Sequence, residues 1–307
     1  MGTRRVLLTM VMALIVVAQP LGAVAAPPEE AVYLSLGTSL AAGTLADAEG
    51  NSIDFSDQSY TDQLFQRIGG RVAADLAHVK LGCPGETTDQ FMGGVNVSGQ
   101  PSNCAADYST GSQMGDALAT LAAENVVLIT IDIGANDLTQ ALGPCGFNDP
   151  SCLGAQIQAI AGNVGQIVGT LRQVGGYTGP IVGMNYYNPF VAAAIGFFNG
   201  VPGQQAPDPA LALASDTLAQ AFNGALAQAY AATGAEVADV YTAFSAGNFT
   251  DQSPMNGIAD NVDVLCKLSF MCPDDPDAKP NRHLNPKGYR VVAKVFIGVI
   301  AGIEFDM

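Results

Sequence analysis

Short apolar runs alternate along this chain with longer stretches of helical periodicity, and this alternation restricts the possible folds more than any other feature. The apolar runs, which have the length of buried strands, cover residues 31–36, 77–81, 126–133, 181–187 and 236–241. The helical stretches, with apolar residues three and four apart, cover residues 60–68, 111–123, 156–174, 211–232 and 286–301. Strands that alternate with helices form a parallel sheet that is covered on both faces. We therefore expect an α/β domain around a parallel sheet.

The first 26 residues differ from the rest of the chain. Two early arginines precede an apolar run over residues 6–18, and small residues follow at Ala23, Ala25 and Ala26. This pattern is typical of a secretory signal peptide. The apolar run is about a dozen residues long, whereas a membrane span needs about 20. We expect residues 1–26 to be removed, the remaining chain to be secreted, and no stable membrane span.

Residues 27–307 are enough to bury one large core, and no repeat or low-complexity linker divides them. We expect a single domain that acts as a monomer. The whole chain has 12 Lys and Arg against 28 Asp and Glu, a formal net charge of −16. Such an acidic chain is a poor partner for a phosphate backbone, so we expect no nucleic-acid binding.

All six cysteines lie after the predicted leader, and an even number suits disulfides in an oxidising compartment. Sequence alone leaves the connectivity open. We predict sequential pairs, because each pair brackets a loop-like segment with Gly, Pro or Asn: Cys83–Cys104, Cys145–Cys152 and Cys266–Cys272. Zinc is the alternative, but no CxxC spacing occurs and the two histidines are far apart.

Three predicted strands end in unusual turns, and ligands bind at such strand exits in open parallel sheets. Ser39 follows the first strand, Gly85 the second and Asn136 the third. A serine nucleophile needs a nearby base and donors for an oxyanion. The backbone N–H groups of Ser39 and Gly85 and the amide of Asn136 could supply three donors. Each residue also has a plain structural interpretation, as a helix cap or turn residue.

Two histidines could act as the base. His78 falls inside a predicted strand, whereas His283 lies on a predicted loop just before the last helix. The economical pair is therefore Ser39 with His283. Alone, His283 could equally be a solvated loop residue, and it is the joint occurrence of these groups at successive strand exits that favours a catalytic site.

These residues resemble the motifs of the SGNH or GDSL hydrolases. The resemblance runs from about Tyr33 to Phe296 and is carried by Gly37-Thr38-Ser39-Leu40, by Gly85 in Gly-Cys-Pro-Gly-Glu-Thr-Thr, by Gly134-Ala135-Asn136-Asp137, and by His283 with Asn285 and Gly288-Tyr289. It implies a three-layer α/β/α, flavodoxin-like domain with a central parallel five-stranded sheet. It also implies hydrolysis of esters or thioesters without a metal or other cofactor. By position, Ser39 is the nucleophile, His283 the general base and then acid, and Ser39 N–H, Gly85 N–H and Asn136 the oxyanion donors.

Two positions depart from the family pattern. Thr38 stands where the family has Asp, and we expect activity to survive because that carboxylate takes no chemical step. Pro280 stands where the family places an Asp, three residues before His283. Either Asp277 or a backbone carbonyl must then orient the imidazole. We favour the Pro280 carbonyl, since a neutral acceptor also fixes the tautomer, although it stabilises the imidazolium less.

Two long inserts follow the fourth and fifth predicted strands. The insert at residues 190–209 begins with a strongly apolar segment, which could line an acyl pocket, act as a mobile lid or pack on the core as a structural helix. The insert at residues 246–281 is rich in Asp and could bind Ca²⁺. It lacks the EF-hand spacing, and a solvated acidic loop is the simpler interpretation.

Our leading hypothesis is a secreted serine esterase or lipase that forms an acyl-enzyme on Ser39 and acts on a small-molecule or lipid-like ester. The alternative is a non-catalytic secreted binding or cell-surface protein on the same fold, suggested by Pro280. Retention of all four candidate groups argues against it. The substrate stays open between a lipid, an acetylated carbohydrate, a phospholipid and a thioester.

Overall fold

Five parallel strands form the central sheet. They are β1 (Ala31–Gly37), β4 (Leu76–Lys80), β5 (Asn125–Asp132), β6 (Ile181–Met184) and β7 (Glu236–Ala238), and they lie side by side in the order β4-β1-β5-β6-β7. The structure, a computed structural model, describes residues 30–147, 149–198, 200–250 and 257–305. The predicted signal peptide at 1–26 lies outside these residues. Each strand coincides with one predicted apolar run, so the five-stranded parallel sheet is confirmed.

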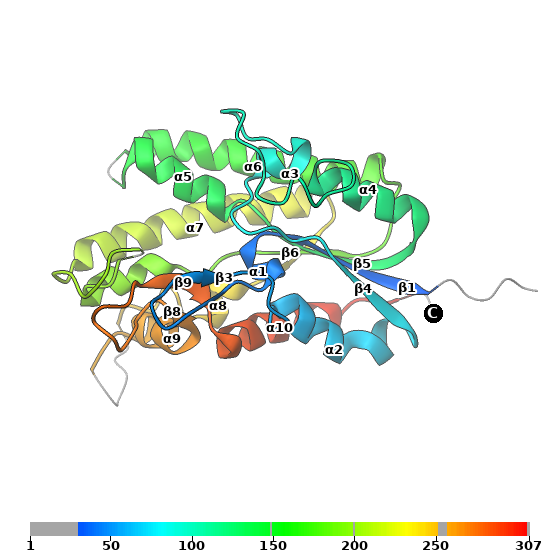
Figure 1. Cartoon of the computed structure of the whole chain (residues 1–307). Helices are drawn as coiled ribbons and strands as arrows, with labels where there is room; N and C mark the ends of the chain where they lie inside the picture. The colour runs from blue at the N-terminus through cyan, green and yellow to red at the C-terminus, as the bar shows by residue number, and fades with distance from the viewer. Residues whose placement is uncertain (1–29, 148, 199, 251–256, 306–307) are drawn as a thin grey trace, which may run out of the picture.

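Helices cover both faces of this sheet (Figure 1). One layer contains α3 (Thr88–Gly93), α4 (Gln113–Ala123), α5 (Ala135–Cys145), α6 (Pro150–Gln173) and α7 (Pro209–Ala232). The opposite layer contains α2 (Tyr60–Val72), α8 (Val240–Ala243), α9 (Asp260–Leu268) and α10 (Pro286–Ile300). The three-layer α/β/α architecture expected from the sequence is therefore confirmed.

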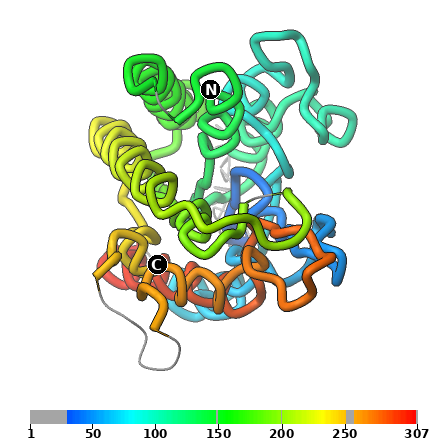
Figure 2. The backbone as a smooth tube through the Cα atoms, turned by 90° about the vertical axis from the view of Figure 1, so that its left-hand side faces the viewer, coloured from blue at the N-terminus to red at the C-terminus, as the bar shows by residue number. Residues whose placement is uncertain are grey.

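Short elements gather at the carboxyl ends of the strands. They are the single-turn α1 (Ser39–Ala42), the 3-10 helix η1 (Pro189–Ile195), the pair β2 (Leu45–Ala46) and β3 (Ser52–Ile53), and the pair β8 (Ser269–Phe270) and β9 (Asn281–Leu284). Figure 2 looks onto this end, where the yellow-green segment after β6 crosses near the orange segment that contains β8 and β9. Segments far apart in the sequence therefore meet at the exit of β1.

The strands are apolar on both faces because helices bury both faces. All seven residues of β1 are buried, and its Tyr33, Leu34 and Leu36 belong to a core that reaches across the sheet. On the α10 side, the rings of Tyr60 and Phe296 stack with their centroids 4.8 Å apart. This core fixes the sheet and hence the positions of the strand exits.

Two strands end earlier than the sequence predicted. The fourth and fifth apolar runs were expected to stay extended to residues 187 and 241, whereas β6 ends at Met184 and β7 at Ala238. The side chains that follow explain the difference, because Asn185 Nδ2 donates to Asp239 Oδ1 at 2.8 Å. Asp239 also accepts from the backbone N–H of Thr242 and so begins α8 instead of continuing the strand.

Two further differences concern the candidate residues. The segment after Gly134 was predicted as a turn, but Asn136 lies in the first turn of α5, which begins at Ala135. His283 was predicted on a loop and instead lies on β9, which pairs with β8. The helix boundary after it was predicted correctly, because Asn285 accepts from the N–H groups of Lys287 and Gly288 and caps α10.

The three sequential disulfides are confirmed. They join Cys83 to Cys104, Cys145 to Cys152 and Cys266 to Cys272, and they use all six cysteines. The first bond closes the loop that contains Gly85, the second connects the end of α5 to the start of α6, and the third connects α9 to the segment after β8.

The second insert is less loop-like than expected. Its Asp260 and Asp263 lie in the first turn of α9, and Lys267 one turn later forms an ion pair with Asp263. Within the described ranges, no three His, Cys, Asp or Glu side chains gather as ligands for a metal ion. None of the described helices is both long and apolar enough to cross a membrane.

Candidate active site

Ser39 stands at the sharp turn between β1 and α1. Gly37 makes this turn possible, since its φ is +132° and a Cβ there would overlap the backbone and side chain of Asp132. Ser39 is the first residue of α1 and is 8% exposed. The strand exit predicted from the sequence therefore presents its hydroxyl residue at the carboxyl edge of the sheet.

A cavity of about 100 Å³ opens at this edge and brings together three of the four predicted site residues. Ser39, Asn136 and His283 all line it. Most of the remaining wall is apolar or aromatic and comes from α1, α5, the segment between β6 and η1, the start of η1, and α7: Leu40, Ala135, Leu138, Tyr186, Tyr187, Pro189, Phe190, Leu218, Ala219 and Phe222. A reacting group here would be largely shielded from water.

Gly85, the fourth predicted residue, is not part of the cavity wall but is linked to it. Asn136 Nδ2 donates to the carbonyl of Glu86 at 3.0 Å, which holds the loop of Gly85 against the start of α5. An amide nitrogen carries two N–H groups, so one is left for a ligand. Among the described residues, neither the backbone N–H of Ser39 nor that of Gly85 has a hydrogen-bond partner. The three donors predicted for an oxyanion therefore each keep at least one N–H without a partner inside the described structure.

Asn281 orients His283, and the hypothesis that Pro280 or Asp277 does so is wrong. His283 Nδ1 lies 2.8 Å from Asn281 Oδ1. The Pro280 carbonyl instead accepts from the backbone N–H of Gly200 at 3.1 Å, and the Asp277 side chain is exposed to solvent. A short polar side chain two residues before His283 was the available sequence signal, but the family pattern directs attention to the third position.

The contacts of Asn281 also determine the tautomer of His283. The same Oδ1 accepts from the backbone N–H of His283 at 2.9 Å, and Nδ2 donates to the carbonyl of Gly50 at 3.0 Å. The atom that faces the imidazole is therefore an acceptor, so Nδ1 carries the proton. Nε2 keeps its lone pair and can act as a base.

Burial keeps this imidazole neutral. Burial, with a smaller contribution from the neighbouring cation Arg282, lowers the pKa of His283 to about 3. In the described structure no hydrogen bond joins Ser39 Oγ to His283 Nε2, although both residues line one cavity. Such bonds commonly tighten only when substrate binds.

A buried carboxylate supports the turn from the side opposite the cavity. Asp132 at the end of β5 accepts from Thr38 N at 3.1 Å, from Thr38 Oγ1 at 2.8 Å and from Tyr60 OH at 3.1 Å. Burial raises the pKa of Asp132 to about 7. Thr38 stands where the family has Asp. In this chain the turn therefore supplies a hydroxyl, and the carboxylate that supports the turn is Asp132 of the neighbouring strand β5. Nothing in the sequence indicated the contact between Thr38 and Asp132, because the two residues are 94 positions apart in the chain.

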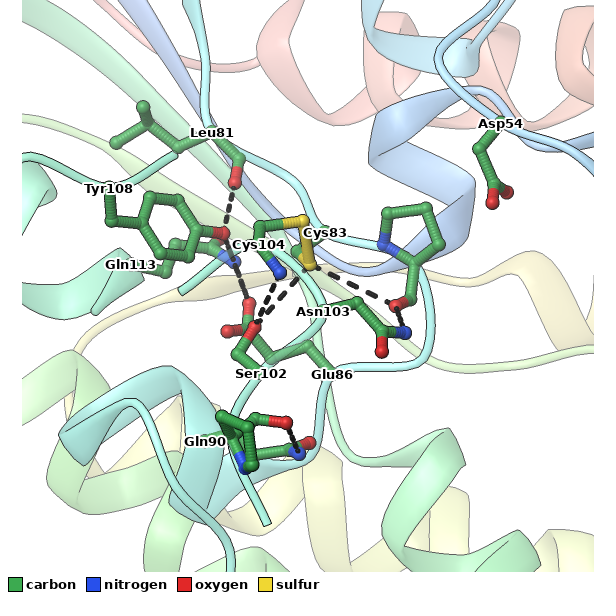
Figure 3. Close-up of a disulfide and its surroundings, with 12 residues drawn as sticks. Asp54, Leu81, Cys83, Glu86, Gln90, Ser102, Asn103, Cys104, Tyr108 and Gln113 are labelled. Carbon is green, nitrogen blue, oxygen red and sulfur yellow. Dashed lines mark hydrogen bonds between the residues drawn. A yellow bond between two sulfur atoms is a disulfide. The ribbon is translucent and has the colours of Figure 1, made fainter. Parts of the chain in front are cut away.

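Figure 3 shows how the loop of Gly85 is anchored. The Cys83–Cys104 disulfide closes it, and Asn103 Nδ2 donates to the carbonyl of Pro84 at 2.8 Å. Gln113 connects this loop to the β1 exit: its Nε2 donates both to Glu86 Oε2 and, at 2.9 Å, to the carbonyl of Gly37. Burial raises the pKa of the Glu86 carboxyl to about 7.

His78 is excluded as the base by its position. Its Nε2 lies 2.9 Å from Ser35 Oγ, and its ring stacks on Tyr33 with the centroids 4.6 Å apart. It lies on β4, outside the cavity wall, and burial lowers its pKa to about 4. The choice of His283 over His78 agrees with this arrangement.

The three-layer fold, with its cavity at the strand exits, has the SGNH-type architecture. The model of the GDSL-like Lipase/Acylhydrolase family matches residues 35–291, and the chain therefore belongs to this family and hydrolyses ester bonds. A search of the curated proteins found no match.

Solved structures show the same fold. An extracellular lipase from Streptomyces rimosus is 16% identical, with a TM-score of 0.50 over 87% of this chain and 99% of that one. The lipase Lip_vut3 from a goat rumen metagenome is also 16% identical, with a TM-score of 0.51 over 87% of this chain and 96% of that one. At this identity the likeness concerns the fold, which confirms the predicted SGNH architecture.

Proposed function

We propose that this chain is a secreted serine esterase or lipase that acts through an acyl-enzyme on Ser39. The observation that carries the proposal is the single cavity lined by Ser39, Asn136 and a neutral His283 whose Nδ1 is occupied by Asn281. This combination provides a nucleophile, an oriented base and an amide donor in one shielded space. The predicted leader and the three disulfides support secretion.

The reaction would proceed in two halves. His283 Nε2 takes the proton of Ser39 Oγ as the oxygen attacks the ester carbonyl carbon. Backbone N–H groups of Ser39 and Gly85 and the amide of Asn136 stabilise the oxyanion. The imidazolium then protonates the leaving alcohol as the ester C–O bond breaks. In the second half a water molecule, deprotonated by His283, attacks the acyl-enzyme and releases the acid and Ser39.

The wall of the cavity favours esters with an apolar part. Leu138, Phe190 and Phe222 contribute apolar surface beside the candidate nucleophile. Phe190 belongs to the insert that was expected either to line an acyl pocket or to pack on the core. It lines the cavity, while the following Val191 and Ala192 are buried in the core. We therefore favour a small-molecule or lipid-like ester as substrate.

A fluorophosphonate probe tests the proposal directly. The wild-type protein should be labelled at Ser39, and Ser39→Ala should not be labelled. Turnover of a short p-nitrophenyl ester should fall by roughly several orders of magnitude in Ser39→Ala and in His283→Ala. Ser98→Ala, on an exposed loop, should behave as wild type.

Absence of labelling, or equal labelling of wild type and Ser39→Ala, would contradict the assignment of the nucleophile. The family match argues against the alternative, a non-catalytic binding protein, which only the missing carboxylate behind His283 suggested. Clear ester hydrolysis that disappears in Ser39→Ala would eliminate it.

A further inference from the structure

Arg282 places a permanent positive charge in the wall of the candidate active site. It precedes His283 on β9 and lines the same cavity as Ser39. All the other residues described in this wall are uncharged, apart from the imidazole of His283, which burial keeps neutral. The cavity therefore presents one cation among mostly apolar surfaces.

Among the described residues, no carboxylate forms an ion pair with this cation. The ion pairs formed within the described residues are Lys80–Asp62 and Lys267–Asp263. The contact made by the guanidinium of Arg282 is a long one, from Nη1 to Thr139 Oγ1 at 3.4 Å. A guanidinium has five N–H donors, so most of them are left for a ligand.

The isolation of Arg282 is unusual in a chain this acidic. The whole sequence carries a net charge of −16, yet no carboxylate of the described ranges lines this cavity. Burial penalises a charged side chain unless it is paired, and it lowers the pKa of Arg282. Among the described residues, no carboxylate offsets the cost of burying this guanidinium. A buried cation of this kind is expected where the substrate itself supplies the matching anion.

Local packing holds the arginine in place. Tyr187 OH donates to the backbone carbonyl of Arg282 at 2.6 Å, and this tyrosine also lines the cavity. Thr139, the contact of the guanidinium, donates in turn to the carbonyl of Ala135 in the first turn of α5. The Arg282 backbone is thus held by Tyr187, and its guanidinium lies beside Thr139 on α5.

We propose that Arg282 binds an anionic group, a carboxylate or a phosphate, carried by the ester substrate beside its scissile bond. The planar guanidinium matches the geometry of both anions with paired N–H donors. This inference rests on the proposed function, because it assumes that ester cleavage occurs at Ser39. It adds that the enzyme prefers esters with a negative charge near the carbonyl, on the acyl or on the alcohol side.

Two pairs of esters test the proposal and distinguish the two sides. On the acyl side, p-nitrophenyl hydrogen glutarate is compared with its neutral methyl ester. On the alcohol side, 4-acetoxybenzoate is compared with methyl 4-acetoxybenzoate. The measured quantity is the ratio of kcat/KM for the charged ester to kcat/KM for its neutral partner. In at least one pair this ratio should fall by about tenfold or more in Arg282→Gln, because a charge-assisted contact is lost.

Matched variants complete the experiment. Arg282→Lys keeps the charge but loses the planar fork, so its ratio should lie between those of wild type and Arg282→Gln. Arg290→Gln removes the same charge from an exposed position on α10 and should leave the ratio unchanged. Arg282→Met provides a second neutral variant if the glutamine variant does not fold.

Equal losses on charged and neutral esters, in both pairs, would overturn the proposal and leave Arg282 with a structural role in holding β9 against α5. Failure of the proposed function has a different signature. In that case Ser39→Ala would retain the hydrolysis of both members of each pair, whatever the variants of Arg282 do.

Discussion

Asn281 sets the orientation of the candidate base, His283. Its Oδ1 fixes Nδ1–H of His283, but an uncharged acceptor gives the imidazolium less support than a carboxylate would. The neighbouring Arg282 adds a positive charge on the same strand. The protein therefore orients its base well and stabilises the protonated base weakly.

Removing the amide should lower turnover without removing the nucleophile. We expect Asn281→Ala to reduce kcat by about one to two orders of magnitude, since one orienting hydrogen bond to a buried group is lost. Fluorophosphonate labelling should become slower but still occur at Ser39. Asn125→Ala, at the exposed start of β5, serves as the control. An unchanged kcat in Asn281→Ala would show that packing alone orients His283.

The acid limb of the pH profile should reflect two buried groups. Because the pKa of His283 is lowered to about 3, the imidazole stays in its basic form as the pH falls from 7 towards 4, and it should cause no loss of kcat/KM near pH 6.5. Asp132, whose pKa is raised to about 7, ionises as the pH rises and then accepts more strongly from Thr38. We expect a modest rise in kcat/KM around pH 7 from this group.

Asp132→Asn separates the two contributions. The variant should lose the part of the inflection near pH 7 that Asp132 contributes, and keep activity into the acid range until the fold itself fails. The Glu86 carboxyl, whose pKa is also raised to about 7, accounts for any remaining inflection there. A large fall in kcat/KM centred near pH 6.5 that persists in Asp132→Asn would show that His283 titrates as an ordinary histidine, contrary to its burial.

At the scale of elements, the sequence predicted where the strands end but not which side chains support the candidate catalytic residues there. Apolar runs flanked by small residues located β1, β4 and β5, and Ser39, Gly85 and Asn136 follow from those positions. The role of the orienting amide was not predicted, because it depends on the contact of β9 with the β2–β3 segment, where Asn281 also donates to the carbonyl of Gly50. Long-range contacts of this kind leave no periodic signal.

The helix α5 illustrates the same limit. The start of α5 was missed because its N-cap Gly134 and its first-turn residues Asn136 and Asp137 are common in turns. In the structure both oxygens of Asp137 accept from the backbone N–H of Thr88, a contact between segments 49 residues apart. The sequence left open whether residues 190–209 line an acyl pocket, move as a lid or pack on the core. In the structure Phe190 lines the cavity and Val191 and Ala192 are buried in the core.

At the scale of the whole molecule, one extensive core supports a rim of loops that carries the candidate chemistry. The core runs from Tyr33 on β1 to Phe296 on α10, while the three disulfides lie in connections outside the central sheet. Removing a disulfide should therefore lower stability through its loop without dismantling the sheet. Only a loop that reaches the cavity should also change catalysis.

The disulfides allow these two effects to be separated. Cys83–Cys104 spans 21 residues and Cys266–Cys272 spans six, so loop-closure entropy predicts losses of about 3 and about 2 kcal/mol in the free energy of unfolding. We expect the double variant Cys83→Ser/Cys104→Ser to show the larger fall in Tm by calorimetry. It should also lower kcat, because Gly85 and its N–H lose their anchor beside Asn136.

Cys266→Ser/Cys272→Ser is the matched control, with a smaller fall in Tm and kcat close to that of wild type. Thiol titration of the unfolded, unreduced wild type should find no free cysteine, in line with the three bonds. If both double variants lose kcat equally, the Gly85 loop has no special part in catalysis. If neither does, the oxyanion donors are held by Gln113 and the sheet alone, since Gln113 bonds both Glu86 and Gly37.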